Sequence, residues 1–161
     1  MPGVLTVLSC PPPLCPHVEF AVAAALGVPA ALQWSNQPAR PGMAYAALEW
    51  RAEAGAAGRL ASRLKGLGSI VFEVTCGPAA GCDSERYSFS PELGLFHANT
   101  AANGDIIVGE GQLRALAEEA HGRSALVTGL HQLIGTDWDA ELEPLRQGGD
   151  GAPVTWLRRT G

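Results

Sequence analysis

Residues 44–75, AYAALEWRAEAGAAGRLASRLKGLGSIVFEVT, contain a complete strand–helix–strand unit, and their pattern decides the fold. Apolar and polar side chains alternate over residues 44–51 and again over residues 70–75, which is typical of half-buried strands. Between these segments leucines recur at helical spacing, which predicts a helix over residues 56–66 with one buried stripe.

The chain before residue 44 has a similar order. A β-branched apolar run over residues 4–9 predicts a strand, and consecutive prolines then form a stiff connection. Pro16 suits the first turn of a helix over residues 16–26, and residues 32–35 alternate as a second strand. The order β-α-β-β-α-β predicts an α+β protein whose ferredoxin-like first half has two helices on one face of an antiparallel sheet. The residues expected in its core are Val22, Leu26, Trp50, Leu60, Leu64, Phe72 and Val74.

The second half of the chain is less regular. Asn103-Gly104 lies between apolar runs at residues 93–98 and 105–108, which predicts a hairpin followed by helices. A last strand over residues 154–157 must find the edge of a sheet.

Three helical stripes are expected after the hairpin, at residues 113–120, at residues 124–134 and from Thr136 onward. Pro144 is expected to end or kink the last of them, because proline disfavours helical backbone in the residue before it. No linker separates the halves, so we expect one domain, residues 1–161, made of a ferredoxin-like half (1–76) and an elaborating half (77–161). The open face of the sheet must be covered by this second half or by a partner.

Two pairs of residues on the last helix are spaced four apart. Trp138 and Leu142 share one face and are expected to point inward. Asp139 and Glu143 share another face, expected to point outward with no basic residue nearby. Solvation is the ordinary interpretation of these carboxylates, and the alternative is a basic protein partner.

Composition excludes several classes of function. Hydrophobic residues make up 47% of the chain and charged residues 17%, which is enough apolar material for a core. A net charge of −5 without a basic stripe argues against a nucleic-acid partner. The longest apolar run is far below the roughly 20 residues of a membrane span, and no leader peptide is visible, so we expect a soluble cytoplasmic protein.

The four cysteines and the known motifs predict neither a metal nor a cofactor. The spacings C-x4-C and C-x5-C are loose for zinc, and thiols stay reduced in the cytoplasm. The phosphate-binding, nucleophile-elbow and zinc-protease signatures are absent from the sequence. We therefore expect no cofactor and no metal, and leave any small-molecule ligand unspecified.

Cys15, His17 and Glu19 cluster at the predicted start of the first helix. Such a cluster could hold a metal or a thiolate whose pKa the helix dipole lowers, and the ordinary alternative is that Cys15 and His17 cap the helix.

His97 is the centre of a second candidate site. Across the Asn103-Gly104 turn, Asp105 is expected within reach of His97, and with His17 they could form a pocket holding a general base. The ordinary alternative is a half-buried histidine beside an acidic turn residue.

Four segments together resemble a known family: residues 15–19 (CPHVE), 91–98 (PELGLFHA), 103–106 (NGDI) and 138–144 (WDAELEP). The family consists of small uncharacterised actinobacterial proteins, catalogued as a domain of unknown function, and the resemblance spans nearly the whole chain. It implies an association with fatty-acid synthesis but no catalytic residues, because none are established for the family.

Two functions compete on these grounds. The first is a non-catalytic protein-interaction or self-associating module that serves a metabolic complex, with another protein or a second copy as its partner. The second is a small enzyme or small-ligand-binding protein that uses His17, His97 and Asp105 in a cleft between the halves.

Overall fold

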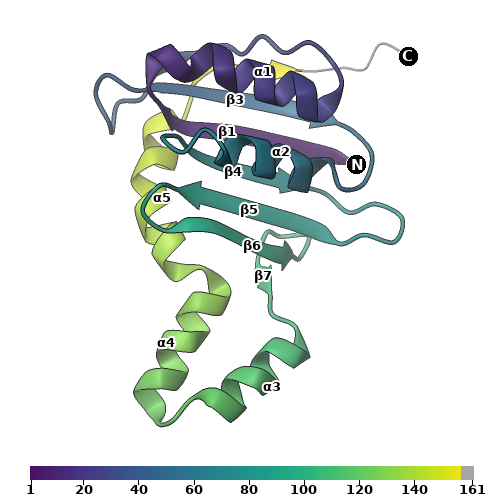
Figure 1. Cartoon of the computed structure of the whole chain (residues 1–161), viewed down its shortest axis with the longest axis vertical. Coiled ribbons are helices and arrows are strands. Elements are labelled where there is room, and N and C mark those ends of the chain that lie inside the picture. The colour runs from purple at the N-terminus through teal and green to yellow at the C-terminus, as the bar shows by residue number, and fades with distance from the viewer. Residues whose placement is uncertain (157–161) are drawn as a thin grey trace.

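A computed structural model describes residues 1–156, and its first half has the expected order of elements. The sheet order is β2-β3-β1-β4, every neighbouring pair is antiparallel, and α1 and α2 lie on the same face (Figure 1). The α+β class and the ferredoxin-like arrangement of the first half are therefore confirmed. The elements are β1 (Pro2–Cys10), a 3-10 turn η1 (Pro12–Leu14), α1 (Cys15–Leu26), β2 (Ser35–Asn36), β3 (Ala44–Arg51), α2 (Ala56–Lys65) and β4 (Val71–Cys76).

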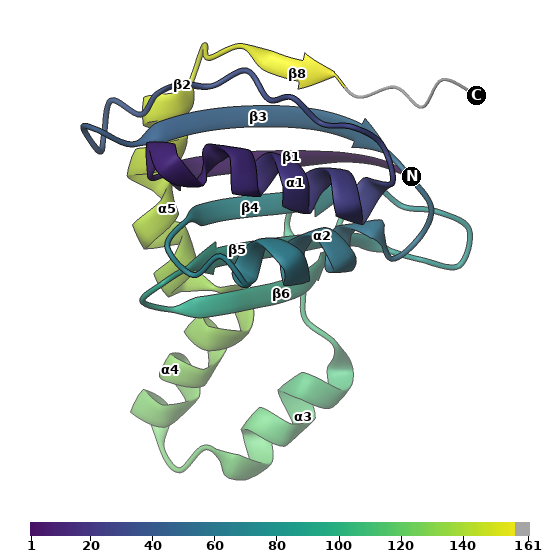
Figure 2. The same ribbon diagram turned by 45° about the horizontal axis from the view of Figure 1, so that its top comes forward.

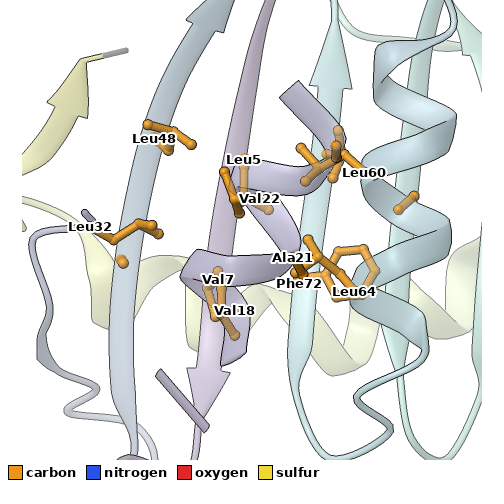
Figure 3. Close-up of a cluster of buried hydrophobic side chains, with 14 of the residues drawn as sticks. Leu5, Val7, Val18, Ala21, Val22, Leu32, Leu48, Leu60, Leu64 and Phe72 are labelled. Carbon is orange, nitrogen blue, oxygen red and sulfur yellow. The ribbon is translucent and has the colours of Figure 1, made fainter. Parts of the chain in front are cut away.

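The main core lies between the two helices and the sheet. Leu60 and Leu64 of α2 are fully buried and point at the same face of the sheet as Val22 of α1 (Figure 3). Burial of each such side chain contributes roughly 1.5–3 kcal/mol to folding. All seven residues expected in the core are buried.

The second half extends the sheet and adds three helices. β5 and β6 continue the sheet outward from β4 as an antiparallel hairpin, and the two-residue β7 forms the far edge. β8 pairs in parallel with β3, so the last strand does find an edge; Leu157, also expected in it, is outside the described residues. The elements are β5 (Ser84–Ser90), β6 (Gly94–Thr100), β7 (Ile106–Ile107), α3 (Glu110–Glu119), α4 (Arg123–Ile134), α5 (Thr136–Gly149) and β8 (Val154–Trp156).

The face of the sheet opposite α1 and α2 is covered by α5 (Figures 1 and 2). Leu142 and Leu145 of α5 pack on Leu8, Tyr45 and neighbouring small residues of the sheet. The second half of the chain therefore supplies the expected cover of this face.

Two local expectations differ from the structure in whole or in part. The second strand, expected over residues 32–35, is reduced to β2, because the backbone N–H of Leu32 donates to the Glu19 carboxylate at 2.8 Å instead of to a strand. Pro144 does not end α5, which runs on to Gly149. Leu145, buried directly after the proline, holds this end of the helix on the sheet.

α3 and α4 extend away from the sheet as a helical hairpin, which we call the arm (residues 110–134; Figures 1 and 2). Gly135 joins the arm to α5 with a left-handed backbone, φ 73°, which glycine adopts at little cost. A Cβ atom at this position would lie 2.7 Å from the Phe96 ring, so glycine is required here for space as well.

Candidate functional site

The arm exposes the largest set of aliphatic side chains in the described part of the chain. None of residues 110–134, all of which the structure describes, is buried. On α4 the apolar residues follow i, i+4 and i+8 spacing, so they form one stripe along the helix. The exposed members on both helices are Leu113, Leu126, Val127, Leu130 and Ile134.

The two arm helices meet where a leucine packs on a glycine. Leu116 of α3 lies directly over Gly129 of α4, where a Cβ atom would come within 2.2 Å of the leucine Cδ1. Beside this contact is an open groove of about 560 Å³, lined partly by Ala120, Ala125 and Thr128. By helical periodicity this groove lies on a different side of α4 from the stripe through Leu126 and Leu130.

The start of α5 is fixed to the sheet by residues of the motifs that carry the family resemblance. Trp138 Nε1 donates to the backbone oxygen of Gly94 at 2.9 Å, and its ring lies 5.3 Å from that of Phe96. The Ser90 hydroxyl donates to the Glu141 carboxylate, also at 2.9 Å. These motif residues therefore join the β5–β6 turn to the helix that carries the arm, which is a structural role.

The side chains of Asp139 and Glu143 face solvent as expected, but the expectation that no basic residue lies near them was wrong. Arg146 lies 3.0 Å from Asp139 and 3.2 Å from Glu143, and it also binds Glu73 on β4 at 2.9 Å. Arg86 of β5 pairs with both Glu73 and Asp139. The guanidinium groups come from a strand and from the next turn of the same helix, so they bind these carboxylates within the chain.

A cluster of titratable side chains surrounds the Glu85 carboxylate on β5. The Tyr87 hydroxyl donates to it at 3.2 Å, His97 Nε2 lies 3.1 Å away, and the Cys76 thiol donates at 3.8 Å. The rings of Tyr87 and His97 stack at 4.4 Å. Burial and the neighbouring carboxylate raise the pKa of Tyr87 to about 12, and burial raises that of Cys76. The phenol and thiol therefore stay protonated near neutral pH, as hydrogen-bond donors.

The structure gives His97 different partners from those expected. Thr100 pairs with Ile106, which places Asp105 four positions along the strand from His97, roughly 13 Å away. Asp105 accepts instead from the side chain of Asn103, at 2.8 Å within its own turn. Glu85 was missed in the sequence, although the register of β5 on β6 would have placed it beside His97.

His17 and Cys15 lie in another part of the molecule. The residue of β1 that lies level with His97 in the sheet is Leu5. The two are three strands apart, roughly 14 Å across the sheet. His17 is exposed on the first turn of α1, which follows the far end of β1. Cys15 contacts the Cys10 thiol, with their Sγ atoms 4.0 Å apart. The structure thus brings Cys15 to Cys10 and His97 to Glu85, and does not bring His17, His97 and Asp105 together.

These features define a class of protein: an α+β chain with a ferredoxin-like first half, an enlarged sheet and a projecting helical arm. The family model described as "Protein of unknown function (DUF3145)" matches residues 4–159, so the chain belongs to that family. No curated protein and no solved structure matches the chain.

Two further observations concern membranes and metals. Within residues 1–156, no helix combines the length and apolar character needed to cross a bilayer. Over the same residues, no three side chains among His, Cys, Asp and Glu converge in a way that could hold a metal ion.

Proposed function

We propose that this protein is a non-catalytic self-associating module, and that the arm binds the arm of a second copy. The observation that carries the proposal is the absence of any buried residue in residues 110–134. Helices of 10 and 12 residues are marginally stable in water unless an apolar face is covered. The arm therefore requires a partner surface to stay folded, and its exposed leucines mark the face to be covered.

The charge of the arm favours a second copy as that partner. The arm carries three carboxylates (Glu110, Glu118, Glu119) and two guanidinium groups (Arg114, Arg123), so its net charge is −1 out of −5 for the whole chain. Most of the negative charge lies outside the arm, so a strongly basic partner would be attracted there rather than to the arm. Two arms present nearly neutral surfaces to each other, so their association meets little electrostatic repulsion.

Symmetry supplies a second argument. In a two-fold dimer the same patch contacts itself, so the apolar stripe of α4 would be covered by an equivalent apolar stripe. Two helical hairpins placed face to face form a four-helix bundle, a stable arrangement for short amphipathic helices. The arm helices are only about 15 and 18 Å long, so the interface is small and we expect a dimer of micromolar affinity.

The test compares charge insertions in the arm and outside it. Leu126→Glu with Leu130→Glu places two carboxylates in the apolar stripe, and Phe20→Glu places one on the exposed face of α1, where Phe20 is 76% exposed. Sedimentation equilibrium over a range of concentrations should show a dimer for the wild type and for Phe20→Glu, and a monomer for the arm variant. Near-UV circular dichroism verifies that the sheet core is intact. A wild type that stays monomeric, or an arm variant that still dimerises, would contradict the proposal.

The resemblance to the family suggests a setting for this dimer. We propose that it serves a metabolic complex of fatty-acid synthesis in the cytoplasm. Enzymes of that pathway should then co-purify with the wild type from a native lysate, and recovery of unrelated proteins alone would count against this setting.

A further inference from the structure

Cys10 and Cys15 form a thiol pair at the junction of β1 and α1. Their Sγ atoms are 4.0 Å apart and share a thiol–thiol hydrogen bond. Cys10 ends β1 and is fully buried, whereas Cys15 begins α1 and is partly exposed. Cys15 can therefore be reached from solvent, and the sulfur of Cys10 lies directly behind it.

We propose that Cys10 and Cys15 are a reversible dithiol–disulfide pair that is oxidised by low-molecular-weight disulfides. Cys15 is the attacking thiol, since it is partly exposed whereas Cys10 is fully buried. Cys10 is the resolving thiol, protected from solvent and held within contact of Cys15. An accessible thiol next to a resolving one is the arrangement that permits reversible oxidation.

The segment between the two cysteines holds them together. Residues 11–13 are prolines, each with a fixed φ, and the backbone N–H of Leu14 donates to the oxygen of Pro11 at 2.8 Å. A connection with so few accessible conformations loses little entropy when its ends are bonded. The effective concentration of Cys10 at Cys15 is therefore high, which favours ring closure over capture of a second external thiol.

The reaction proceeds in two balanced steps. The Cys15 thiolate attacks one sulfur of the external disulfide, forms a mixed disulfide and releases one thiolate. The Cys10 thiolate then attacks the Cys15 sulfur, forms the protein disulfide and releases the second thiolate. Two protein thiols are oxidised, one external disulfide is reduced to two thiols, and no other reactant is needed.

The protonation of the pair sets the rate of this exchange. Burial, followed by the charge of and hydrogen bond to Cys15, raises the pKa of Cys10 to about 12. Burial also raises the pKa of Cys15; the hydrogen bond with Cys10 opposes this shift and the charge of Glu19 adds to it. Cys15 therefore ionises first, and exchange should be slow near neutral pH and accelerate as pH rises.

Peptide mapping can test the pair in the wild-type protein. Trypsin, which does not cleave the Arg40–Pro41 bond, places Cys10 and Cys15 in one peptide, residues 1–51, and the remaining two cysteines in another, residues 66–86. After equilibration with mixtures of reduced and oxidised glutathione, free thiols are alkylated and the peptide masses are measured by mass spectrometry. The first peptide should lose both alkylation sites together and two hydrogens, whereas the second can lose a site only by gaining one glutathione at the exposed Cys82. Retention of both sites in the first peptide at every glutathione ratio would overturn the proposal.

Variants separate the roles of the two thiols. Cys10→Ala should leave Cys15 as a stable mixed disulfide with glutathione, and Cys15→Ala should leave Cys10 reduced, because Cys10 is buried. Cys82→Ser removes an exposed cysteine and should not change the oxidation of the first peptide. Oxidation of Cys10 in the Cys15→Ala variant, or the absence of a mixed disulfide in Cys10→Ala, would contradict the assigned roles. Thermal melts of each variant verify folding.

Discussion

Tyr87 and Cys10 share a property that depends on where the folded chain places them. Both are held in their neutral forms: burial, helped by Glu85 in one case and by Cys15 in the other, raises each pKa to about 12. In an unfolded chain a tyrosine ionises near pH 10 and a cysteine near pH 8.5. The folded state therefore binds protons that the unfolded state releases in alkaline solution.

This difference predicts that stability declines at alkaline pH. A folded-state pKa raised above the unfolded value stabilises the fold fully below the unfolded pKa, and the contribution is lost as pH rises toward the folded pKa. The urea concentration at the midpoint of unfolding should therefore decrease as pH rises from about 8.5 to about 12. Tyr87→Phe should reduce the slope of that decline above about pH 10, and Cys82→Ser should leave it unchanged. An unaltered slope in Tyr87→Phe would show that the phenol titrates normally.

At the scale of elements, α5 connects the sheet to the arm. It covers one face of the sheet with Leu142 and Leu145, and it carries the arm at its first residue. Gln37, only 1% exposed, donates to the backbone oxygens of Leu8 and Leu145 and so ties the end of β1 to this helix. Gly149 allows the last turn to approach Tyr45, where a Cβ atom would lie 2.1 Å from the ring.

The charged network under α5 provides a prediction at this scale. Glu73 is 12% exposed and binds both Arg86 and Arg146, so Glu73→Gln leaves two poorly solvated guanidinium groups without this carboxylate. We expect a loss of about 2–3 kcal/mol in the free energy of unfolding, below the value for a fully buried pair because Arg146 is 25% exposed. Glu143→Gln, at an exposed pair, should cost less than about 1 kcal/mol. Equal losses in the two variants would mean that solvent reaches the whole network.

Sequence periodicity predicted the first half well because its signals are local. Alternating strands and leucine stripes identify a buried face within a few residues, and α1, α2 and the core residues were confirmed for that reason. The contacts that fix α5 to the sheet have no such local signal. Ser90 binds Glu141, 51 residues away, and Gln37 binds Leu145, 108 residues away. The partners of His97 were misjudged for the same reason, since they depend on the register of β5 on β6, which brings Glu85 to His97.

At the scale of the whole molecule, two regions should differ in stability. The sheet core is shared by β-strands and three helices, whereas in the proposed dimer the arm is stabilised by contacts with a second chain. Amide hydrogen exchange in the arm should therefore become slower as protein concentration rises, while exchange in β1 and β4 should not depend on concentration. The Leu126→Glu, Leu130→Glu variant should show fast exchange in the arm at every concentration. Arm protection that is independent of concentration in the wild type would indicate a hairpin that is stable by itself.

The shortness of the outermost strands has a consequence for aggregation. An open sheet offers unpaired backbone N–H and C=O groups at its edges, and long free edges recruit strands from other molecules into amyloid-like stacks. Here the two-residue β7 covers only Asn99 and Thr100 of β6 on one edge, and on the other β2 and β8 divide the outer side of β3 between them. The outermost strands β2, β7 and β8 have only two or three residues each, so none of them offers a long, regular template for another strand.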